Sequence, residues 1–344
     1  MKKDEIEKHD FEGYLLHKLE TVKVEIAEIT KFERGFSRET WFVKAKTNGT
    51  TKDYTFRRDI PGGSIQPFPL RLEYEIYDRL SNSTIPVAKT LWYEENPVEF
   101  IPGPDFYVRE KVEGSWKVPN FDNSAVEYDD VRISACLEHM KKLALIHTAD
   151  WKSLGFAEIF SVPPDTESCA KHTVERIIGE LRNFQIEPLP IVTEALEWLR
   201  ENAPEDSPCI SLLKGTNGIG EEIWQNNQIV ALSDWEESSL GDPASDFAHI
   251  QELLPPPTGW SNESKMFHLK DALAFYESVS GIPITEERLN FYRVVRSLES
   301  VLYSHHASLP LIAKEKPLAR FAWVATEVMH SGEMGLAKAA GILE

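Results

Sequence analysis

The sequence is short of positive charge. Its 344 residues include 37 Lys and Arg against 56 Asp and Glu, which gives a formal net charge of −19. A surface this acidic repels phosphate backbones and anionic lipid headgroups, so we expect neither nucleic acid nor a membrane as a partner. The charge is compatible with a cationic small molecule, but acidity alone identifies no substrate.

Cysteine and long apolar runs are also scarce. Cys136, Cys169 and Cys209 lie far apart, form no C-x-x-C pair and offer no metal-ligand spacing. No run approaches the roughly 20 apolar residues of a membrane span. The first twenty residues lack the apolar core of a signal peptide. These absences predict a cytoplasmic protein with reduced thiols.

Apolar residues are ample for a packed interior, since 42% of the chain is hydrophobic and 10% is aromatic. The length exceeds that of one ordinary core, so two lobes are expected. Strand-like runs, broken by one helix, fill the first part, and from about Gly114 helical patterns dominate. The sequence therefore predicts an α+β protein with a β-rich N-lobe, residues 1–113, and a mostly helical C-lobe, residues 114–344.

A glycine-rich stretch, "KGTNGIGE" at residues 214–221, follows an apolar run and invites comparison with a dinucleotide-binding turn. That turn needs a full helix after its glycines. Only "EEIWQNNQ" separates Gly220 from the next strand-like run, "IVALSDW", which leaves no room for a crossover helix. "QNNQ" instead predicts a turn, so we expect a β-hairpin over residues 221–234. In the same way, Asn48-Gly49 predicts a hairpin turn in the N-lobe.

A loop, a short hairpin and an Asp at the end of its second strand together form the catalytic region of the protein-kinase-like fold. Several segments resemble the aminoglycoside phosphotransferase (APH) family in particular. They are "RGFSRETWFV", "YTFRRDIPGG", "RLEYEIYDRL", "LALIHTADWKSLGF" and "IVALSDWEESSLGDPASDFAHI". The resemblance covers nearly the whole chain in order. It implies a two-lobe kinase-like fold in which the catalytic-loop hairpin, residues 209–236, and the substrate pocket belong to the C-lobe.

The resemblance also implies a nucleotide phosphate contact on the N-lobe. Arg57 matches the basic residue of the third strand, and Glu73 matches its acidic partner on the N-lobe helix. Arg58 is the alternative to Arg57, because adjacent strand residues point to opposite faces. An ordinary salt bridge between strand and helix would give the same pattern without any nucleotide.

Two further nucleotide contacts rest on the resemblance alone. The hairpin around Gly35 would fold over the phosphates, although a hairpin without any ligand would have the same sequence pattern. The Glu110 carbonyl and the Val112 amide would meet an adenine edge, and such backbone contacts leave no side-chain signature. The implied cofactors are ATP or GTP together with Mg²⁺, and the implied partner is a small-molecule substrate.

The catalytic loop departs from the family pattern. That pattern is His-Gly-Asp, four further residues and Asn, where the Asp receives the acceptor proton and the Asn binds a metal. Here Lys214, Gly215, Thr216 and Glu221 occupy those places. Thr216 cannot serve as a general base at pH 7, whereas Glu221 could still bind a metal as a harder ligand. Asp234 keeps the place of the family's metal-binding Asp.

Three functions follow from this altered loop. The first is ATP-dependent phosphorylation of a small hydroxyl compound, without the usual base. The second is a pseudokinase that binds nucleotide or a metabolite without turnover. The third is elimination or hydrolysis in the same cleft, with Lys214, Thr216 or Glu221 recruited as catalytic groups. We interpret His147, Asp150, Asp242 and Asp246 of the recognised segments mainly as structural residues, with His147 in helix packing and Asp242 and Asp246 as caps or hydrogen-bond anchors.

Overall fold

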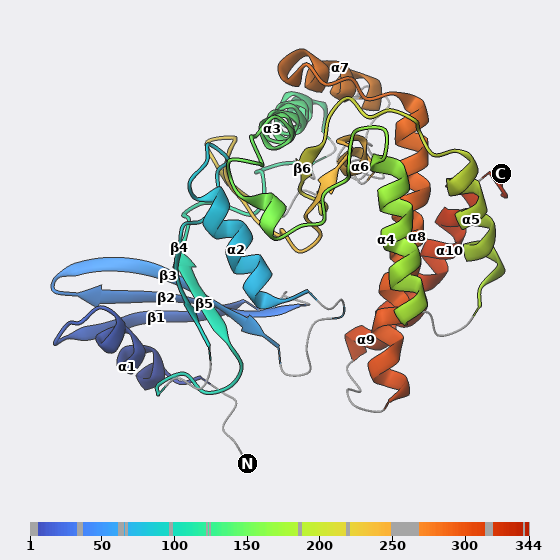
Figure 1. Ribbon diagram of the computed structural model, residues 1–344. Helices are drawn as coiled ribbons and strands as arrows, with labels where there is room; N and C mark the ends of the chain where they lie inside the picture. Colours follow the sequence, from blue (N-terminus) through green and yellow to red (C-terminus); the bar gives the residue numbers. More distant parts are fainter. Residues whose placement is uncertain are drawn as a thin grey trace. The chain divides into compact units, whose positions relative to one another are not determined.

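The computed structural model describes residues 6–32, 37–60, 65, 68–95, 99–121, 123, 125–184, 188–217, 221–248, 268–313, 319–339 and 341–343. The predicted α+β class is confirmed, with a β-rich first part and a helical second part (Figure 1). Two features singled out above, the turn around Gly35 and the glycines at 218 and 220, lie outside the described residues. The proline-rich stretch 255–260, which the sequence predicts to be a rigid loop, also lies outside them.

The chain divides into two compact units. Unit 1 comprises Met1–Ser81 and Val87–Val112, and unit 2 comprises Asn82–Pro86 and Glu113–Glu344. The short segment 82–86, which the sequence analysis places in the N-lobe, therefore groups with the second unit. One physical reason is a main-chain hydrogen bond in which the Leu232 amide donates to the Pro86 carbonyl at 2.8 Å.

Unit 1 is built on one five-stranded antiparallel sheet with the order β1-β2-β3-β5-β4. The strands are β1 (Val24–Phe32), β2 (Arg38–Thr47), β3 (Thr50–Asp59), β4 (Thr90–Glu94) and β5 (Phe106–Glu110). Asn48 and Gly49 join β2 to β3 with φ values of 50° and 85°, the left-handed conformations of a two-residue hairpin turn. This predicted turn is confirmed.

The alternation of side chains along β3 gives the sheet two different faces. Tyr54 and Phe56 point to one face and pack in an apolar cluster with Phe11 of helix α1 (Lys8–Lys18). Arg57 points to the other face, where helix α2 (Leu70–Leu80) lies. Figure 1 shows the two helices on opposite sides of the sheet. The period of two in the strand thus places Tyr54 and Phe56 on one face and Arg57 on the other.

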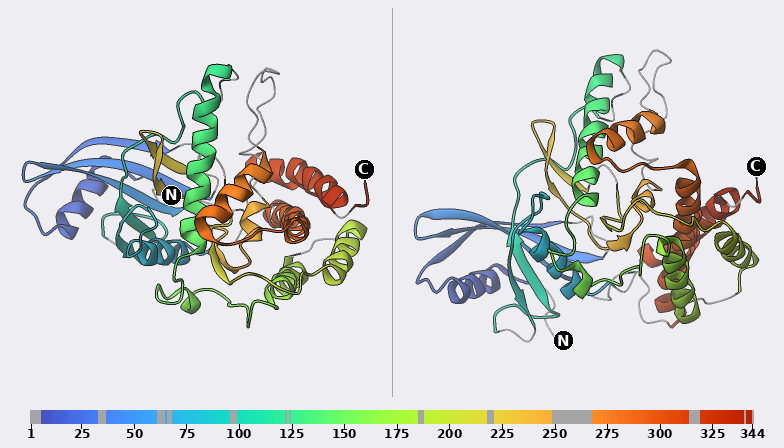
Figure 2. Two further views of the ribbon diagram at one scale, coloured as in Figure 1. Left: turned by 90° about the horizontal axis from the view of Figure 1, so that it is seen from above. Right: turned by 45° about the horizontal axis from the view of Figure 1, so that its top comes forward.

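Unit 2 is mostly helical. Its helices are α3 (Asp129–His147), α4 (Cys169–Phe184), α5 (Pro190–Glu201), α6 (Ala244–Phe247), α7 (Leu269–Ser280), α8 (Glu286–Ile312), α9 (Ala319–Trp323) and α10 (Met329–Ala339). Helices α4, α5 and α10 contact the long helix α8 and share one apolar core with it (Figures 1 and 2). Within the described part of the chain, no helix has both the length and the apolar character needed to cross a membrane.

Two small antiparallel sheets complete unit 2. Strand β6 (Ser211–Leu213) pairs with β9 (Ser239–Gly241), and β7 (Glu222–Gln225) pairs with β8 (Gln228–Leu232). Between β7 and β8, Asn226 and Asn227 have φ values of 49° and 60°. Two positive φ values in succession are typical of a type I′ hairpin turn, which Asn adopts at low cost. The hairpin predicted from "QNNQ" is confirmed.

Candidate functional site

In unit 1, the two residues predicted at the nucleotide phosphates form an ion pair. The Nε atom of Arg57 on β3 lies 2.8 Å from Oε1 of Glu73 on α2. The Glu73 side chain is almost fully buried, whereas 16% of the Arg57 side chain is exposed. Arg57 therefore retains access to solvent while a buried carboxylate holds it in place.

A second arginine, which the sequence analysis missed, shares Glu73. Nε of the buried Arg38 donates to Oε2 of Glu73 at 3.0 Å, and the Tyr107 hydroxyl donates to Oε1 at 2.7 Å. Burial by itself would raise the pKa of Glu73, but Arg57, Arg38 and the Tyr107 hydroxyl together hold that pKa below its usual value. One carboxylate thus faces two guanidinium groups, and Arg38 also pairs with Asp59 at 2.5 Å, so Glu73 belongs to a network of ion pairs on this face of the sheet.

Arg58, the alternative to Arg57, points to the opposite face of the sheet. Its Nε donates to Oε2 of Glu39 at 2.8 Å and its Nη1 donates to the Pro102 carbonyl at 2.6 Å. Its guanidinium carbon also lies 4.9 Å from the centre of the Trp41 ring. The Arg58 side chain is buried in these contacts, so of the two adjacent arginines Arg57 is the one that pairs with the helix.

The residues predicted to meet the adenine lie at the end of β5. The Glu110 amide donates to the Lys89 carbonyl at 2.8 Å, which ties the end of this strand to the start of β4. Val112 is the last residue of unit 1. Contact of these two residues with a base stays a prediction.

In unit 2, a buried carboxylate holds the start of the predicted catalytic loop. Asp246 on α6 accepts hydrogen bonds from the amides of Lys214 and Gly215, both at 2.8 Å. Nε2 of His147 lies 2.9 Å from the same carboxylate, and Nδ1 of His147 lies 2.7 Å from the Tyr276 hydroxyl. Asp246 and His147 thus act as structural anchors, although His147 works through hydrogen bonds more than through the packing we expected.

The loop leaves no space for a side chain at Gly215. Its φ is +81°, and a β-carbon there would lie 2.4 Å from the backbone oxygen of Glu237. Real β-carbons do not approach other atoms so closely, so a glycine is required here for two reasons at once. Gly215, which belongs to the stretch compared above with a dinucleotide turn, instead lets the loop backbone pass close to the backbone of Glu237.

We expect Gly215→Ala to destabilise the protein by about 1–3 kcal/mol beyond the cost of a left-handed backbone alone. The matched control is Gly281→Ala, since Gly281 ends α7 with φ +73° and a β-carbon there would meet no atom of a non-adjacent described residue within 4 Å. The two free energies of unfolding are measured by urea denaturation. Equal losses would show that the Glu237 backbone moves aside without cost.

The Lys214 side chain runs inward and is fully buried. Its ammonium donates to the Thr216 carbonyl, to Oε2 of Glu221 at 3.3 Å and to the Asp234 carbonyl at 3.4 Å. Burial lowers the pKa of Lys214, but Glu221, Asp234 and Glu222 raise it by more, so the net shift is upward and the group stays charged. Lys214 therefore links the start of the loop to both ends of the hairpin.

Glu221 and Asp234 lie at the two ends of the β7–β8 hairpin. The Ser233 amide, next to Asp234, donates to the Glu221 carbonyl at 2.9 Å, which brings the two ends together. Burial and the charges of Asp234 and Glu222 raise the pKa of Glu221 to about 7, even though Lys214 opposes that shift. Asp234 is half-buried and has φ 63°, a left-handed conformation that turns the chain directly after β8.

Solved structures share this architecture. A Ralstonia eutropha protein assigned provisionally as an aminoglycoside phosphotransferase matches with a TM-score of 0.68 and 20% identity, over 99% of this chain and 100% of the other. A variant of the phosphotransferase APH(4)-Ia in complex with ADP and hygromycin B matches with a TM-score of 0.60 and 14% identity, over 96% and 97%. A macrolide 2′-phosphotransferase matches with a TM-score of 0.57 and 14% identity, over 96% and 98%.

The chain has the APH fold. No family model matches its sequence. Curated relatives include acyl-CoA dehydrogenase family member 11 of Rattus norvegicus, 24% identical over 275 residues, and that of Gallus gallus, 26% identical over 279 residues. These alignments cover 78% and 77% of this chain but 32% and 34% of the relatives. The chain thus spans about a third of the length of the curated relatives it matches.

Glu221 and Asp234 stay predicted metal ligands, and the structure places their carboxylates in different surroundings. Asp234 is half-buried and lies in the left-handed turn that follows β8. The Glu221 carboxylate instead pairs with the Lys214 ammonium. Among the residues that the structure describes, no group of three or more His, Cys, Asp or Glu is arranged to hold a metal by itself. Nucleotide phosphates would have to complete the coordination.

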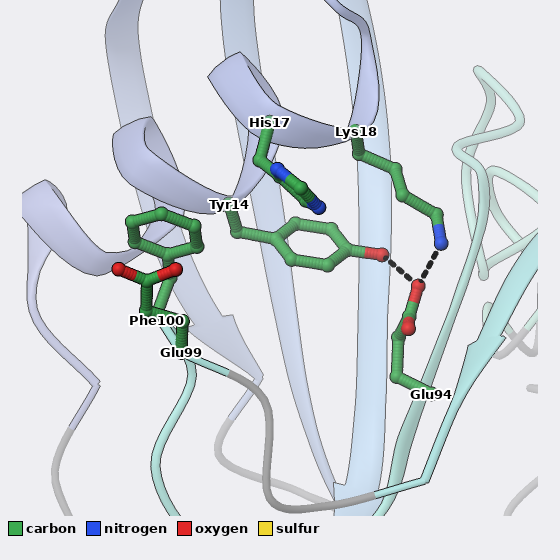
Figure 3. Close-up of a pocket in the computed structure, with 6 residues that line it drawn as sticks. All are labelled: Tyr14, His17, Lys18, Glu94, Glu99 and Phe100. Atoms are coloured by element: carbon green, nitrogen blue, oxygen red, sulfur yellow. Dashed lines mark hydrogen bonds and ion pairs between the residues drawn. The ribbon is translucent and has the colours of Figure 1, made fainter.

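A small pocket in unit 1 contains none of the predicted residues. Figure 3 shows the Tyr14 hydroxyl and the Lys18 ammonium converging on the Glu94 carboxylate, with the Tyr14 oxygen 2.9 Å from Oε1 of Glu94. Tyr14, Lys18 and Glu94 thus pair with one another, and α1 supplies half of the lining of this pocket. We regard it as a surface hollow of the α1–β4 contact.

Proposed function

We propose that this chain is a nucleotide-dependent phosphotransferase that moves a phosphoryl group from ATP or GTP to a hydroxyl group of a small molecule. The observation that carries the proposal is the Arg57–Glu73 ion pair. Kinase-like catalysis requires a basic residue on the third strand held by an acid on the N-lobe helix. Here a buried Glu73 aligns Arg57, and Arg38 adds positive charge to the same carboxylate.

In this proposal Asp234 holds Mg²⁺, which neutralises charge on the phosphates. Thr216 stands where the family has a base and cannot accept the acceptor proton. A loose phosphoryl-transfer transition state needs little deprotonation of the acceptor, so the proton can leave late, to solvent or to the transferred phosphate. Because general-base catalysis contributes roughly 10²–10⁴ in rate, we expect a slow enzyme.

A second candidate is a protein that binds nucleotide without turnover. Thr216 favours it, because the hydroxyl that replaces the family's carboxylate removes the base while leaving the loop intact. The two candidates share the nucleotide site and differ only in phosphoryl transfer. Measuring acceptor-dependent ADP formation separates them.

The relatives suggest which acceptors to test. The structural neighbours carry aminoglycoside and macrolide phosphotransferase names, and one was solved with hygromycin B. The sequence relatives carry an acyl-CoA dehydrogenase name. A suitable panel therefore contains aminoglycosides, macrolides and hydroxylated acyl-CoA esters. The net charge of −19 would favour the cationic aminoglycosides by long-range attraction.

We expect ATP with Mg²⁺ to raise the melting temperature, since a ligand at 100 times its Kd adds about 2.7 kcal/mol of stability. Arg57→Met should lose this ATP-dependent shift. The matched control is Arg58→Met, next along β3, which breaks a buried pair and lowers the melting temperature but should keep the ATP response. No shift with millimolar nucleotide in the unaltered protein would contradict the proposal.

A further inference from the structure

Two departures from the family's catalytic loop are coupled in this structure. Lys214 stands in place of the family's His, and Glu221 stands in place of its metal-binding Asn. The ammonium of one lies 3.3 Å from a carboxylate oxygen of the other. A lysine and an acid that contact each other thus stand where the family pattern has two neutral side chains.

The Lys214 ammonium is held like a bound cation. It has three N–H donors, and three oxygens accept from it: the Thr216 carbonyl, Glu221 Oε2 and the Asp234 carbonyl. Its side chain is fully buried, and its nitrogen lies 5.9 Å from the centre of the Trp235 ring. No N–H is left to reach a substrate or a phosphate. Lys214 therefore acts as a positioning residue.

We propose that the Lys214 ammonium is a built-in cation that replaces the second metal ion of kinase-like catalytic loops, leaving Asp234 as the only metal site. The inference rests on the proposed function and states which residue of that site holds the metal ion and which supplies the second positive charge. A divalent cation bound to Glu221 would share one carboxylate with the ammonium, and the two positive charges would repel. The ammonium cannot move away, because its other two partners are backbone carbonyls at fixed places.

The test counts Mn²⁺ ions bound per chain, with and without ADP, by electron paramagnetic resonance of the free ion. We expect the unaltered protein to bind one Mn²⁺ in the presence of ADP, and Asp234→Ala to bind none. Glu221→Gln should lower the melting temperature through loss of the ion pair but leave the Mn²⁺ affinity unchanged. If Glu221 ligated the metal, its affinity would fall by more than about tenfold, and that result would overturn the inference.

Lys214→Met supplies the converse experiment. Without the ammonium, Glu221 should gain a Mn²⁺ that the double variant Lys214→Met/Glu221→Gln lacks. The matched control is Lys142→Met, which breaks another Lys–Glu pair in unit 2, with Glu138 at 3.0 Å, and should gain no Mn²⁺. Absence of a gain in a folded Lys214→Met protein would overturn the inference.

The two experiments separate this inference from the proposed function. If Lys214→Met does not fold, Glu221→Gln alone decides, because it leaves the lysine in place. If the unaltered protein binds no Mn²⁺ even with ADP, the proposed function fails. A Mn²⁺ gained by Lys214→Met that depends on Glu221 would still support the built-in cation.

Discussion

Replacing Asp234 with alanine is expected to abolish phosphoryl transfer and the Mg²⁺-dependent stabilisation by ATP. A bound metal supplies several kcal/mol of charge stabilisation in such a transition state. The other two carboxylates of the hairpin do not take over, because Glu221 pairs with Lys214 and Glu222 contacts His139. The overall stability should change less than the activity, since the Asp234 side chain is only half-buried and the variant keeps the backbone carbonyl that accepts from Lys214. The measurements are ADP formation and melting temperature with and without ATP and Mg²⁺.

Thr216→Ala is the matched control for Asp234→Ala. Both residues belong to the predicted catalytic region, but only Asp234 carries a group that can hold a metal. If the acceptor proton leaves late, truncating the Thr216 hydroxyl should change the rate little. Large losses for both variants, equal in size and independent of ATP, would contradict phosphoryl transfer and favour another reaction at this loop.

The features that the sequence predicted correctly are local ones. Consecutive Asn226 and Asn227 specify a tight hairpin wherever two strand-like runs flank them, and Asn48-Gly49 does the same in unit 1. Alternation along a strand shows that Arg57 and Arg58 point to opposite faces of the sheet, but it does not show which of the two faces the helix. The resemblance favoured Arg57, and the ion pair with Glu73 agrees with that choice.

The features that the sequence did not predict are contacts between distant residues. Arg38 meets Glu73 across 35 positions because Arg38 lies opposite Asp59 in the β2–β3 register, on the same face as Arg57. The turn at Asn48 and Gly49 fixes that register, but nothing in the sequence spacing shows that Glu73 of α2 packs against this face. Lys214 and Glu221 were each assigned a separate chemical role, and their pairing depends on how deeply the lysine is buried. The sequence did contain one sign of this pairing, since a Lys and a Glu both replace neutral residues of the family pattern in the same loop.

The anchoring of the loop leads to the second large effect, a loss of stability in Asp246→Asn. Asp246 accepts from the amides of Lys214 and Gly215 and pairs with His147, all within the interior of unit 2. An asparagine would turn a donor toward groups that need an acceptor. Leaving a buried donor without its acceptor typically costs about 1–3 kcal/mol, and more where a charged group is involved, so we expect a loss of at least that size at pH 7 by urea denaturation.

The pH dependence distinguishes this anchoring role from mere packing. Burial alone would raise the pKa of Asp246, but His147 and the two loop amides hold it below the usual value. A carboxylate with a lowered pKa in the folded state contributes stability above its unfolded pKa of about 3.9 and loses it as the pH falls through the folded pKa. The difference between the unaltered protein and Asp246→Asn should therefore shrink below about pH 4.

Asp242 provides the opposite case within the same unit. Burial outweighs its ion pair with Arg288 and raises the pKa of Asp242, so its charged form costs stability at neutral pH. The free energy of unfolding should therefore still fall at acid pH in Asp242→Asn, whereas it should fall less in Asp246→Asn. If both variants differed from the unaltered protein by the same amount at every pH, the Asp246 carboxylate would not be the charged anchor of the loop. The loop would then depend on the shape of its neighbours alone.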